Sequence, residues 1–256
     1  MKPTDDNLRY SRQISLGAVG AAGQARLRTA RALLLGAGGL GTPAAHYLSS
    51  AGLGHLQIID FDTVDITNLP RQNLFRDADA GMPKAEVLAL RLREISPSVS
   101  VTGISRRLDD AMLAAAVAAA DVVLDCTDNF ATRWQLNAAC AAQGVPLVSG
   151  AAIRFEGQVA VFRFDRQPSP CYRCLYDEAD ENLLDCAGQG ILAPVAGTVG
   201  CMLATEAIKV VLDLPSDLQG AVWLYDGLAG NSRRIAIPAR PACPVCGAAA
   251  QAARGS

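Results

Sequence analysis

The most constraining feature of the sequence is a strand–turn–helix segment, ALLLGAGGLGTPAAHYL, at residues 32–48. Its apolar run leads into a turn with the spacing G-x-G-x-x-G, formed by Gly36, Gly38 and Gly41, with Gly39 as an additional glycine. Glycines let the backbone turn tightly and approach phosphate oxygens closely, and the N-terminus of the following helix supplies oriented N–H groups. The segment therefore predicts a nucleotide site, although the turn alone fits NAD, FAD and ATP.

The pattern around this segment predicts an α/β fold. Up to about residue 150, short apolar strands alternate with helical stretches of roughly 10–15 residues, which is typical of βαβ units. This alternation predicts a Rossmann-type, mostly parallel sheet with helices on both faces. The segment 153–164, IRFEGQVAVFRF, predicts two antiparallel strands around Glu156 and Gly157 that extend the sheet.

One domain is expected over residues 1–250, because a chain of 256 residues can bury a large core in a single unit. Residues 1–30 are expected to form an N-terminal helical region, and residues 251–256 a disordered tail. The acidic, glycine-containing segment at about 177–192 has no apolar period, so we expect it to form a mobile loop.

Composition argues against several classes of function. The formal net charge of −2 gives no electrostatic reason to expect nucleic-acid binding. The N-terminus is too polar for a secretory signal, and no apolar run is expected to span a bilayer. We therefore expect a cytoplasmic protein without nucleic-acid or membrane partners.

Polar residues after the second predicted strand favour a nucleoside triphosphate such as ATP as the ligand. Asp60 and Asp62, about 20 residues beyond the glycine turn, are placed to accept hydrogen bonds from ribose hydroxyls. Asn68, Arg71 and Lys84 follow. An enzyme that acts at the α-phosphate of ATP needs such cations to balance charge on the phosphates and on the pyrophosphate leaving group. Each residue alone could equally be a solvated surface group.

A further carboxylate follows the third apolar strand, in LDCTDN. Asp128 is expected at the carboxyl end of that strand, where open α/β sheets bind ligands, and Mg²⁺ typically takes one or two carboxylates plus phosphates. The alternative is that Asp125 or Asp128 merely caps the following helix.

Four of the eight cysteines form two C-x-x-C pairs, Cys171/Cys174 and Cys243/Cys246. In a chain without signs of secretion, this spacing favours a closed, structural zinc site with four cysteine ligands over disulfides. Cys186 lies apart, in the acidic segment LLDCAGQG, where neighbouring carboxylates disfavour a thiolate. The two histidines, His46 and His55, are expected to be packing or surface residues.

Taken together, RYSRQ, GAGGLG, IIDFDTV, NLPRQNLF, MPKAE, LDCTDN, VPLVSGAAIRFEGQV, PCYRCL and CPVCG resemble the MoeB/ThiF family, bacterial relatives of the ubiquitin-activating enzymes. The resemblance runs from about residue 8 to residue 247 with the segments in consistent order. It implies an ATP-dependent adenylyltransferase that uses Mg²⁺ and carries a structural Zn²⁺.

The resemblance implies site residues position by position. The glycine turn and the aspartate of the next strand match the ATP-binding positions, and further polar residues match phosphate and magnesium contacts. The matching positions are Gly36, Gly38, Gly39, Gly41, Asp60, Asn68, Arg71, Lys84 and Asp128, with Asn129 adjacent to the last; Asp62, next to Asp60, is a further candidate for nucleotide binding. The four paired cysteines match the zinc ligands.

Two more residues match positions with special roles. Arg12 matches an arginine that reaches the ATP of the partner subunit, which implies a homodimer with composite sites. Cys186 matches a loop cysteine that can bond covalently to the activated carrier in ThiF-type members. The implied partners are a ubiquitin-like sulfur-carrier protein ending in Gly-Gly and a sulfur donor such as a cysteine desulfurase, in molybdopterin or thiamine biosynthesis.

Three other functions remain open at this point. A nicotinamide- or flavin-dependent Rossmann oxidoreductase explains the glycine turn and Asp60, but gives no role to Arg12, Arg71, Lys84 or Asp128. A non-catalytic carrier-binding scaffold would be expected to have lost some of those charges. A relative of the tRNA-modifying dehydratases would activate a small carboxylate instead.

Overall fold

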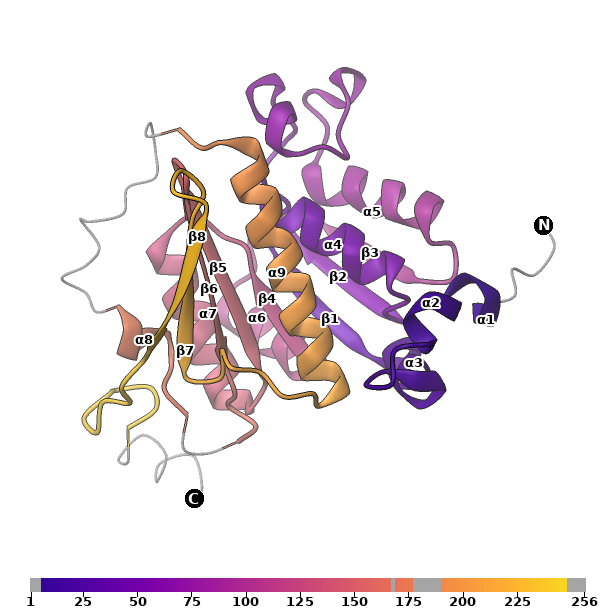
Figure 1. Ribbon diagram of the computed structural model, residues 1–256. Coiled ribbons are helices and arrows are strands. Elements are labelled where there is room, and N and C mark those ends of the chain that lie inside the picture. Colours follow the sequence, from indigo (N-terminus) through magenta and orange to yellow (C-terminus); the bar gives the residue numbers. More distant parts are fainter. Residues whose placement is uncertain (1–5, 167–168, 177–189, 248–256) are drawn as a thin grey trace.

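In the computed structural model, residues 6–166, 169–176 and 190–247 are described, and they contain one eight-stranded sheet. Its strand order is β3-β2-β1-β4-β5-β6-β7-β8 (Figure 1). The strands are β1 (Arg31–Leu35), β2 (His55–Ile59), β3 (Ser100–Ile104), β4 (Val122–Asp125), β5 (Leu147–Ile153), β6 (Glu156–Phe162), β7 (Ala221–Asp226) and β8 (Asn231–Ala236).

The sheet has a parallel half and an antiparallel half. Strands β3, β2, β1, β4 and β5 pair in parallel, and β5 to β8 pair in antiparallel fashion. The predicted Rossmann-type sheet with an antiparallel extension is therefore confirmed. The chain order reverses between β1 and β4, which is where open α/β sheets bind their ligands.

The first antiparallel turn lies two residues earlier than the sequence predicted. Ile153 pairs with Glu156, so the turn consists of Arg154 and Phe155, and Glu156 and Gly157 belong to β6. Arg154 has a φ of 53°, the left-handed conformation that glycine usually supplies. The sequence pattern misled because a glycine marks turns more often than an arginine does.

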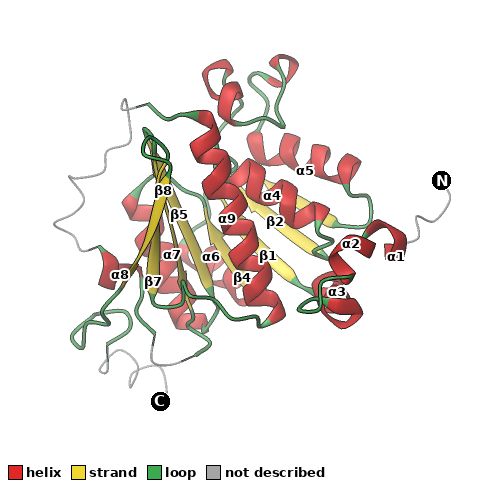
Figure 2. Ribbon diagram, viewed as in Figure 1, coloured by secondary structure: helices red, strands yellow, loops and turns green. Residues whose placement is uncertain are grey.

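Helices cover both faces of the sheet (Figure 2). One core packs α3, α4, α5 and α9 on one face, and the other core packs α6, α7 and α8 on the opposite face. The helices are α1 (Asp6–Arg9), α2 (Ser11–Ile14), α3 (Gly20–Thr29), α4 (Gly41–Ser50), α5 (Lys84–Ile95), α6 (Asp110–Ala118), α7 (Phe130–Gln143), α8 (Tyr172–Leu175) and α9 (Ala193–Leu212), with the 3-10 helices η1 (Ile66–Arg71) and η2 (Asp77–Asp79). The first three of these lie within the N-terminal region predicted to be helical.

The expectation that no apolar run reaches membrane-spanning length needs correction at α9. Among the described residues, this helix alone is long and apolar enough to cross a bilayer, but 61% of that window is buried inside the fold. Val199, Leu203 and Ala207 are fully buried against the sheet. Core packing therefore accounts for its apolar composition.

Candidate active site

The glycine turn connects β1 to α4 at the carboxyl end of the parallel strands. A Cβ atom added to Gly41 would lie 1.8 Å from the carbonyl oxygen of Gly36, and one added to Gly36, whose φ is 92°, would lie 2.7 Å from that of Cys126. Only glycine fits either position. No side chain caps the start of α4, because Leu40 is the N-cap residue. Thr42 N–H already donates to the carbonyl of Gly38 (3.0 Å) and Pro43 has no N–H, so Gly41 is the residue of the first turn of α4 whose amide is available to a phosphate.

Asp60 lies directly beside this turn. Its carboxylate accepts hydrogen bonds from the backbone N–H of Ala37 (2.6 Å) and of Asp62 (2.8 Å). Burial raises the pKa of Asp60, and these two bonds and the charge of Lys84 oppose that rise. The side chain is held rigidly at the end of β2, the position that contacts ribose in Rossmann folds.

Lys84 and Asp62 form an ion pair next to Asp60. Lys84 Nζ lies 3.1 Å from Asp62 Oδ2, and the lysine side chain is 7% exposed whereas that of Asp62 is 55% exposed. The backbone N–H of Lys84 also donates to the carbonyl of Asp62 (2.9 Å). The structure thus brings both predicted residues together, and the nearly buried ammonium group is oriented by its partner.

The helix η1 places the other predicted phosphate contacts. Asp65 caps it by accepting a hydrogen bond from the N–H of Thr67 (2.8 Å). Within it, an Arg71 guanidinium nitrogen donates to Asn68 Oδ1 (2.6 Å), and a Cβ added to Gly39 would lie 3.3 Å from the arginine stem. Asn68 and Arg71 therefore form one unit that packs against the glycine turn.

Sequence reasoning missed Gln72, which follows Arg71. Its side chain is buried, and a Cβ added to Gly38 would find only Gln72 Nε2 within 4 Å, at 3.8 Å. An uncharged residue in a loop carries no chemical signal in the sequence, so only its placement beside the turn identifies it.

The two aspartates of the LDCTDN segment differ in their surroundings: Asp125 is buried and hydrogen-bonded within the fold, and Asp128 is exposed. Asp125 is fully buried and accepts hydrogen bonds from Thr127 Oγ1 (2.7 Å) and Ser149 Oγ (2.9 Å). It therefore ties β4 to β5 and does not cap α7. The N-cap of α7 is Asn129, whose Oδ1 accepts from the N–H of Thr132 (2.9 Å).

Asp128 is exposed and serves no cap either. Its side chain contacts Asn129, whose Nδ2 lies 3.5 Å from Asp128 Oδ1. Its carboxylate is thus open to a ligand, while Asn129 is committed to the helix start by its oxygen and turned toward Asp128 by its nitrogen. A nucleotide contact by Asn129 stays a prediction.

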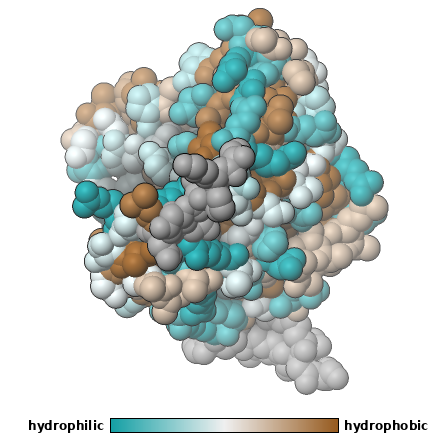
Figure 3. All heavy atoms as spheres, turned by 90° about the vertical axis from the view of Figure 1, so that its right-hand side faces the viewer, coloured by the Kyte–Doolittle hydropathy of each residue, from teal (hydrophilic) through white to brown (hydrophobic). Residues whose placement is uncertain are grey.

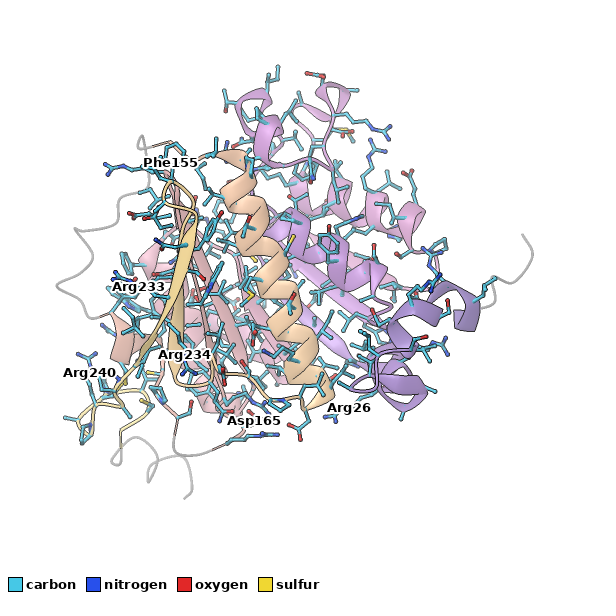
Figure 4. All side chains as sticks on the ribbon, viewed as in Figure 1. Arg26, Phe155, Asp165, Arg233, Arg234 and Arg240 are labelled. Carbon is cyan, nitrogen blue, oxygen red and sulfur yellow. The ribbon has the colours of Figure 1, made fainter. Side chains whose placement is uncertain are left out.

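A cleft of about 610 Å³ is lined by Asp128 and by residues of α7, β5, β6, β7 and β8, and its lining includes no residue of the glycine turn. Phe130 and Tyr176 contribute aromatic walls, and Glu156 and Arg233 contribute charges of opposite sign. Figure 4 labels Arg233 on β8, near α8. Asp128 therefore lies at the boundary between the glycine turn and a cavity large enough for an extended peptide segment.

Arg12 is not part of this arrangement within one chain. Its helix α2 lies beside the start of β1, far from the end of the sheet at which η1 lies (Figure 1). Gln13 Nε2 donates to the carbonyl of Ala51 (3.0 Å), the residue that follows α4. Since α4 has ten residues, α2 and the glycine turn lie at opposite ends of a helix about 15 Å long.

The four paired cysteines converge as predicted. Their sulfur atoms all lie within 4.8 Å of one another, with Cys171 Sγ 3.6 Å from Cys243 Sγ and Cys174 Sγ 3.4 Å from Cys246 Sγ. These separations exceed the roughly 2.05 Å of a disulfide and resemble the roughly 3.8 Å edge of a tetrahedron with 2.3 Å zinc–sulfur bonds. The donor set fits a tetrahedral metal ion that ties α8 to the segment after β8.

Cys140 and the two histidines lie away from the site, whereas the backbone of Cys126 packs against Gly36. Burial raises the pKa of Cys126 and of Cys140, so both thiols remain protonated. His46 lies within α4, where burial lowers its pKa, and His55 lies at the start of β2, opposite the ligand end. Cys186 and its segment lie outside the described residues.

The two aspartates of LDCTDN should separate stability from chemistry. Asp125→Ala leaves the buried hydroxyl of Ser149 and the half-buried one of Thr127 without this acceptor and is expected to lower the free energy of unfolding by about 3 kcal/mol. Asp128→Ala, on an exposed side chain, should change it by less than about 0.5 kcal/mol. Urea denaturation of both variants measures the difference, and equal losses would contradict the assignment.

Comparison with known proteins places the chain in a family. The ThiF family model matches residues 10–245. The chain is 47% identical over 240 residues to molybdopterin-synthase adenylyltransferase of Escherichia coli (strain K12), covering 94% of this chain and 96% of that protein. It is 43% identical over 242 residues to sulfur carrier protein ThiS adenylyltransferase of the same organism, covering 94% and 96%.

The fold agrees with these similarities. A crystal structure of E. coli MccB with ATP matches with a TM-score of 0.81 at 25% identity, covering 93% of this chain and 74% of that one. The eight-stranded order, the glycine turn and the clustered cysteines are thus accompanied by a family match over most of the sequence. The chain belongs to the ThiF family.

Proposed function

We propose that this protein is an ATP-dependent adenylyltransferase that activates the C-terminal glycine of a ubiquitin-like sulfur-carrier protein. The observation that carries the proposal is the position of Asp128, between a phosphate-binding glycine turn and a cleft of about 610 Å³. A nucleotide at the turn and an acyl group in the cleft would meet at this residue.

Different residues around the turn would contact the ribose, the phosphates and the magnesium ion of the nucleotide. Asp60, fixed by two backbone amides, accepts hydrogen bonds from the ribose hydroxyls. The Asn68–Arg71 unit and Lys84 neutralise the phosphates, and Asp128 has the free carboxylate that Mg²⁺ takes beside phosphates. Bound Mg²⁺ would reduce the negative charge on the phosphate oxygens.

This charge distribution favours adenylyl transfer over hydride transfer. A nicotinamide or flavin enzyme has no general need for Arg71, Lys84 and Asp128 around its glycine turn. The names of relatives point the same way, because they include adenylyltransferases for molybdopterin synthase and for ThiS. MccB, solved with ATP, offers a structural precedent for the nucleotide.

The acyl substrate would be the flexible tail of the carrier. Phe130 and Tyr176 contact each other edge to face, with ring centroids 5.7 Å apart, and a narrow Gly-Gly tail could lie along the wall they form and bring its carboxylate to Asp128. That carboxylate is ionised at neutral pH, so the reaction needs no general base. The positions of His46 and His55, both away from the site, agree with this. The carboxylate oxygen attacks the α-phosphorus, the bond to the bridging oxygen breaks, and pyrophosphate leaves with the electron pair.

A second copy of the chain would complete the site. Arg12 is on α2, about the length of α4 away from its own glycine turn, so only the Arg12 of another protomer can approach the phosphates. The face that carries the N-terminal helices mixes hydrophobic with hydrophilic residues (Figure 3). Leu8 and Leu16, which flank α2, are 74% and 57% exposed, so they offer apolar area for a homodimer.

The four paired cysteines would hold zinc in a structural role. The convergence of their four sulfur atoms within 4.8 Å of one another supports this role. A sulfur donor such as a cysteine desulfurase would then convert the acyl-adenylate to a thiocarboxylate in the cytoplasm. A covalent role for Cys186 in that later step remains part of this proposal.

Carrier-dependent exchange of labelled pyrophosphate into ATP tests the activity. Asp128→Ala should reduce the exchange rate by about 10²–10³-fold or more, because charge stabilisation in the transition state is lost. Asp217→Ala, another exposed aspartate, is the matched control and should exchange normally. Exchange at the wild-type rate in Asp128→Ala would remove this residue from the mechanism.

A hybrid dimer tests the composite site. Arg12→Ala and Asp128→Ala homodimers should both be inactive, whereas a dimer of one chain of each kind retains one intact site. Purified by two affinity tags, that hybrid should show about half the exchange activity of the wild-type dimer. An inactive hybrid would mean that Arg12 does not act on the site of its partner.

Metal analysis tests the cysteine cluster. Freshly purified protein should contain about one zinc ion per chain. Cys243→Ser should lose the metal and lower the melting temperature, because a structural zinc contributes directly to folding. Cys201→Ser, outside the cluster on α9, should keep both unchanged. If freshly purified protein contained no zinc, the proposed zinc site would be wrong.

A further inference from the structure

Gln72 is a buried polar side chain without an explained role. It is 2% exposed, and neither atom of its amide group has a hydrogen-bond partner among the described residues: Oε1 is sealed from solvent, whereas Nε2 lies beside the glycine turn. Buried side-chain amides are nearly always paired, because an unsatisfied group costs free energy. A side chain that only filled space at this position would be more stable as methionine, which has a similar volume and no polar atoms.

The amide group faces the glycine turn. Gln72 Nε2 is the one atom within 4 Å of a Cβ added to Gly38, at 3.8 Å. The space beside Gly38 is therefore open apart from this single amide. On the next residue, Gly39, the stem of Arg71 makes the close approach instead, at 3.3 Å. Gln72 and Arg71 thus border adjacent parts of the same turn.

The side of the turn identifies which part of ATP Gln72 would meet. Gly36 packs against Cys126, two residues before Asp128, whereas Gly38 and Gly39 face η1 and Gln72. Asp128 also lines the cleft. In an in-line reaction, the attacking carboxylate and the leaving pyrophosphate lie on opposite sides of the α-phosphorus. A carboxylate that enters at Asp128 leaves the pyrophosphate on the side of Gln72.

We propose that Gln72 is a positioning residue for the leaving group, whose amide nitrogen donates a hydrogen bond to an oxygen of the β- or γ-phosphate. This inference rests on the proposed adenylyltransferase function. It adds a neutral donor to the cations at the turn: the amide orients the pyrophosphate without adding charge that would hold the product. AMP, which lacks these phosphates, does not meet this group.

The test compares ATP with AMP by calorimetry on full-length protein. Gln72→Met should raise the Kd for ATP by about 10–100-fold, the loss expected for one hydrogen bond to a charged group, and change the Kd for AMP by less than about threefold. The KM for ATP in pyrophosphate exchange should rise in step. The melting temperature without nucleotide should stay equal or increase, a result that a purely structural role does not give.

Gln57→Met is the matched control. Gln57 is a half-buried glutamine in the middle of β2, paired in register with Leu33 and Thr102, away from the loop ends. Its substitution should leave the ratio of the two dissociation constants unchanged. Gln72→Glu keeps the shape of the side chain but places a carboxylate toward the phosphates. It should therefore lower the affinity for ATP more than Gln72→Met does. It also supplies a second variant if Gln72→Met fails to fold.

The outcomes separate this inference from the proposed function. Wild-type protein that neither binds ATP nor exchanges pyrophosphate would refute the adenylyltransferase itself. With wild-type activity present, unchanged ATP affinity in the Gln72 variants would overturn the role of Gln72. An equal loss for ATP and AMP would also overturn it, because the residue would then support the nucleoside or the fold and not the leaving group.

Discussion

The close approach of Gly41 to the carbonyl oxygen of Gly36 determines the geometry of the whole site. No side chain fits between them, since a Cβ on Gly41 would lie 1.8 Å from that oxygen. The same turn contacts the end of β4 through Gly36 and the end of β2 through the hydrogen bond from Ala37 to Asp60. Three strand ends are thus tied to one short loop, and each presents its polar residues to the start of α4.

The parts of the fold that depend on local spacing could be predicted from the sequence. The glycine turn, the carboxylates one strand later and the paired cysteines each combine a few neighbouring residues whose chemistry restricts the alternatives. The turn before β6 was misplaced because Arg154 takes a left-handed conformation that its residue type disfavours. Local preference failed there because the pairing of β5 with β6, from Ile153↔Glu156 onward, decides where the strand ends.

Features made by distant segments could not be predicted in this way. The cleft draws its lining from α7, from four strands and from Tyr176 after α8, so no stretch of sequence describes it. The role of Asp125 also depends on Ser149, 24 positions away, which turns an apparent helix cap into a tie between β4 and β5. Gln72 gains its significance only from the open space beside Gly38. Arg12 is an equally strong case, because its own glycine turn lies a helix length away and its proposed role needs a second chain.

The cysteine cluster and the cleft are parts of one construction, although they lie in different halves of the sequence. Cys171 and Cys174 hold the two ends of α8, and Tyr176, two residues beyond, donates a hydrogen bond to Gln158 of β6 (2.7 Å) and lines the cleft. The helix has only four residues, too short to hold its place by its own hydrogen bonds. A metal ion shared with Cys243 and Cys246 would anchor α8 to the end of the chain and thereby hold Tyr176 against the sheet. In the proposed function, the antiparallel half of the sheet would form a wall for the acyl substrate and the parallel half would form the nucleotide site, and Asp128 lies where the two halves meet.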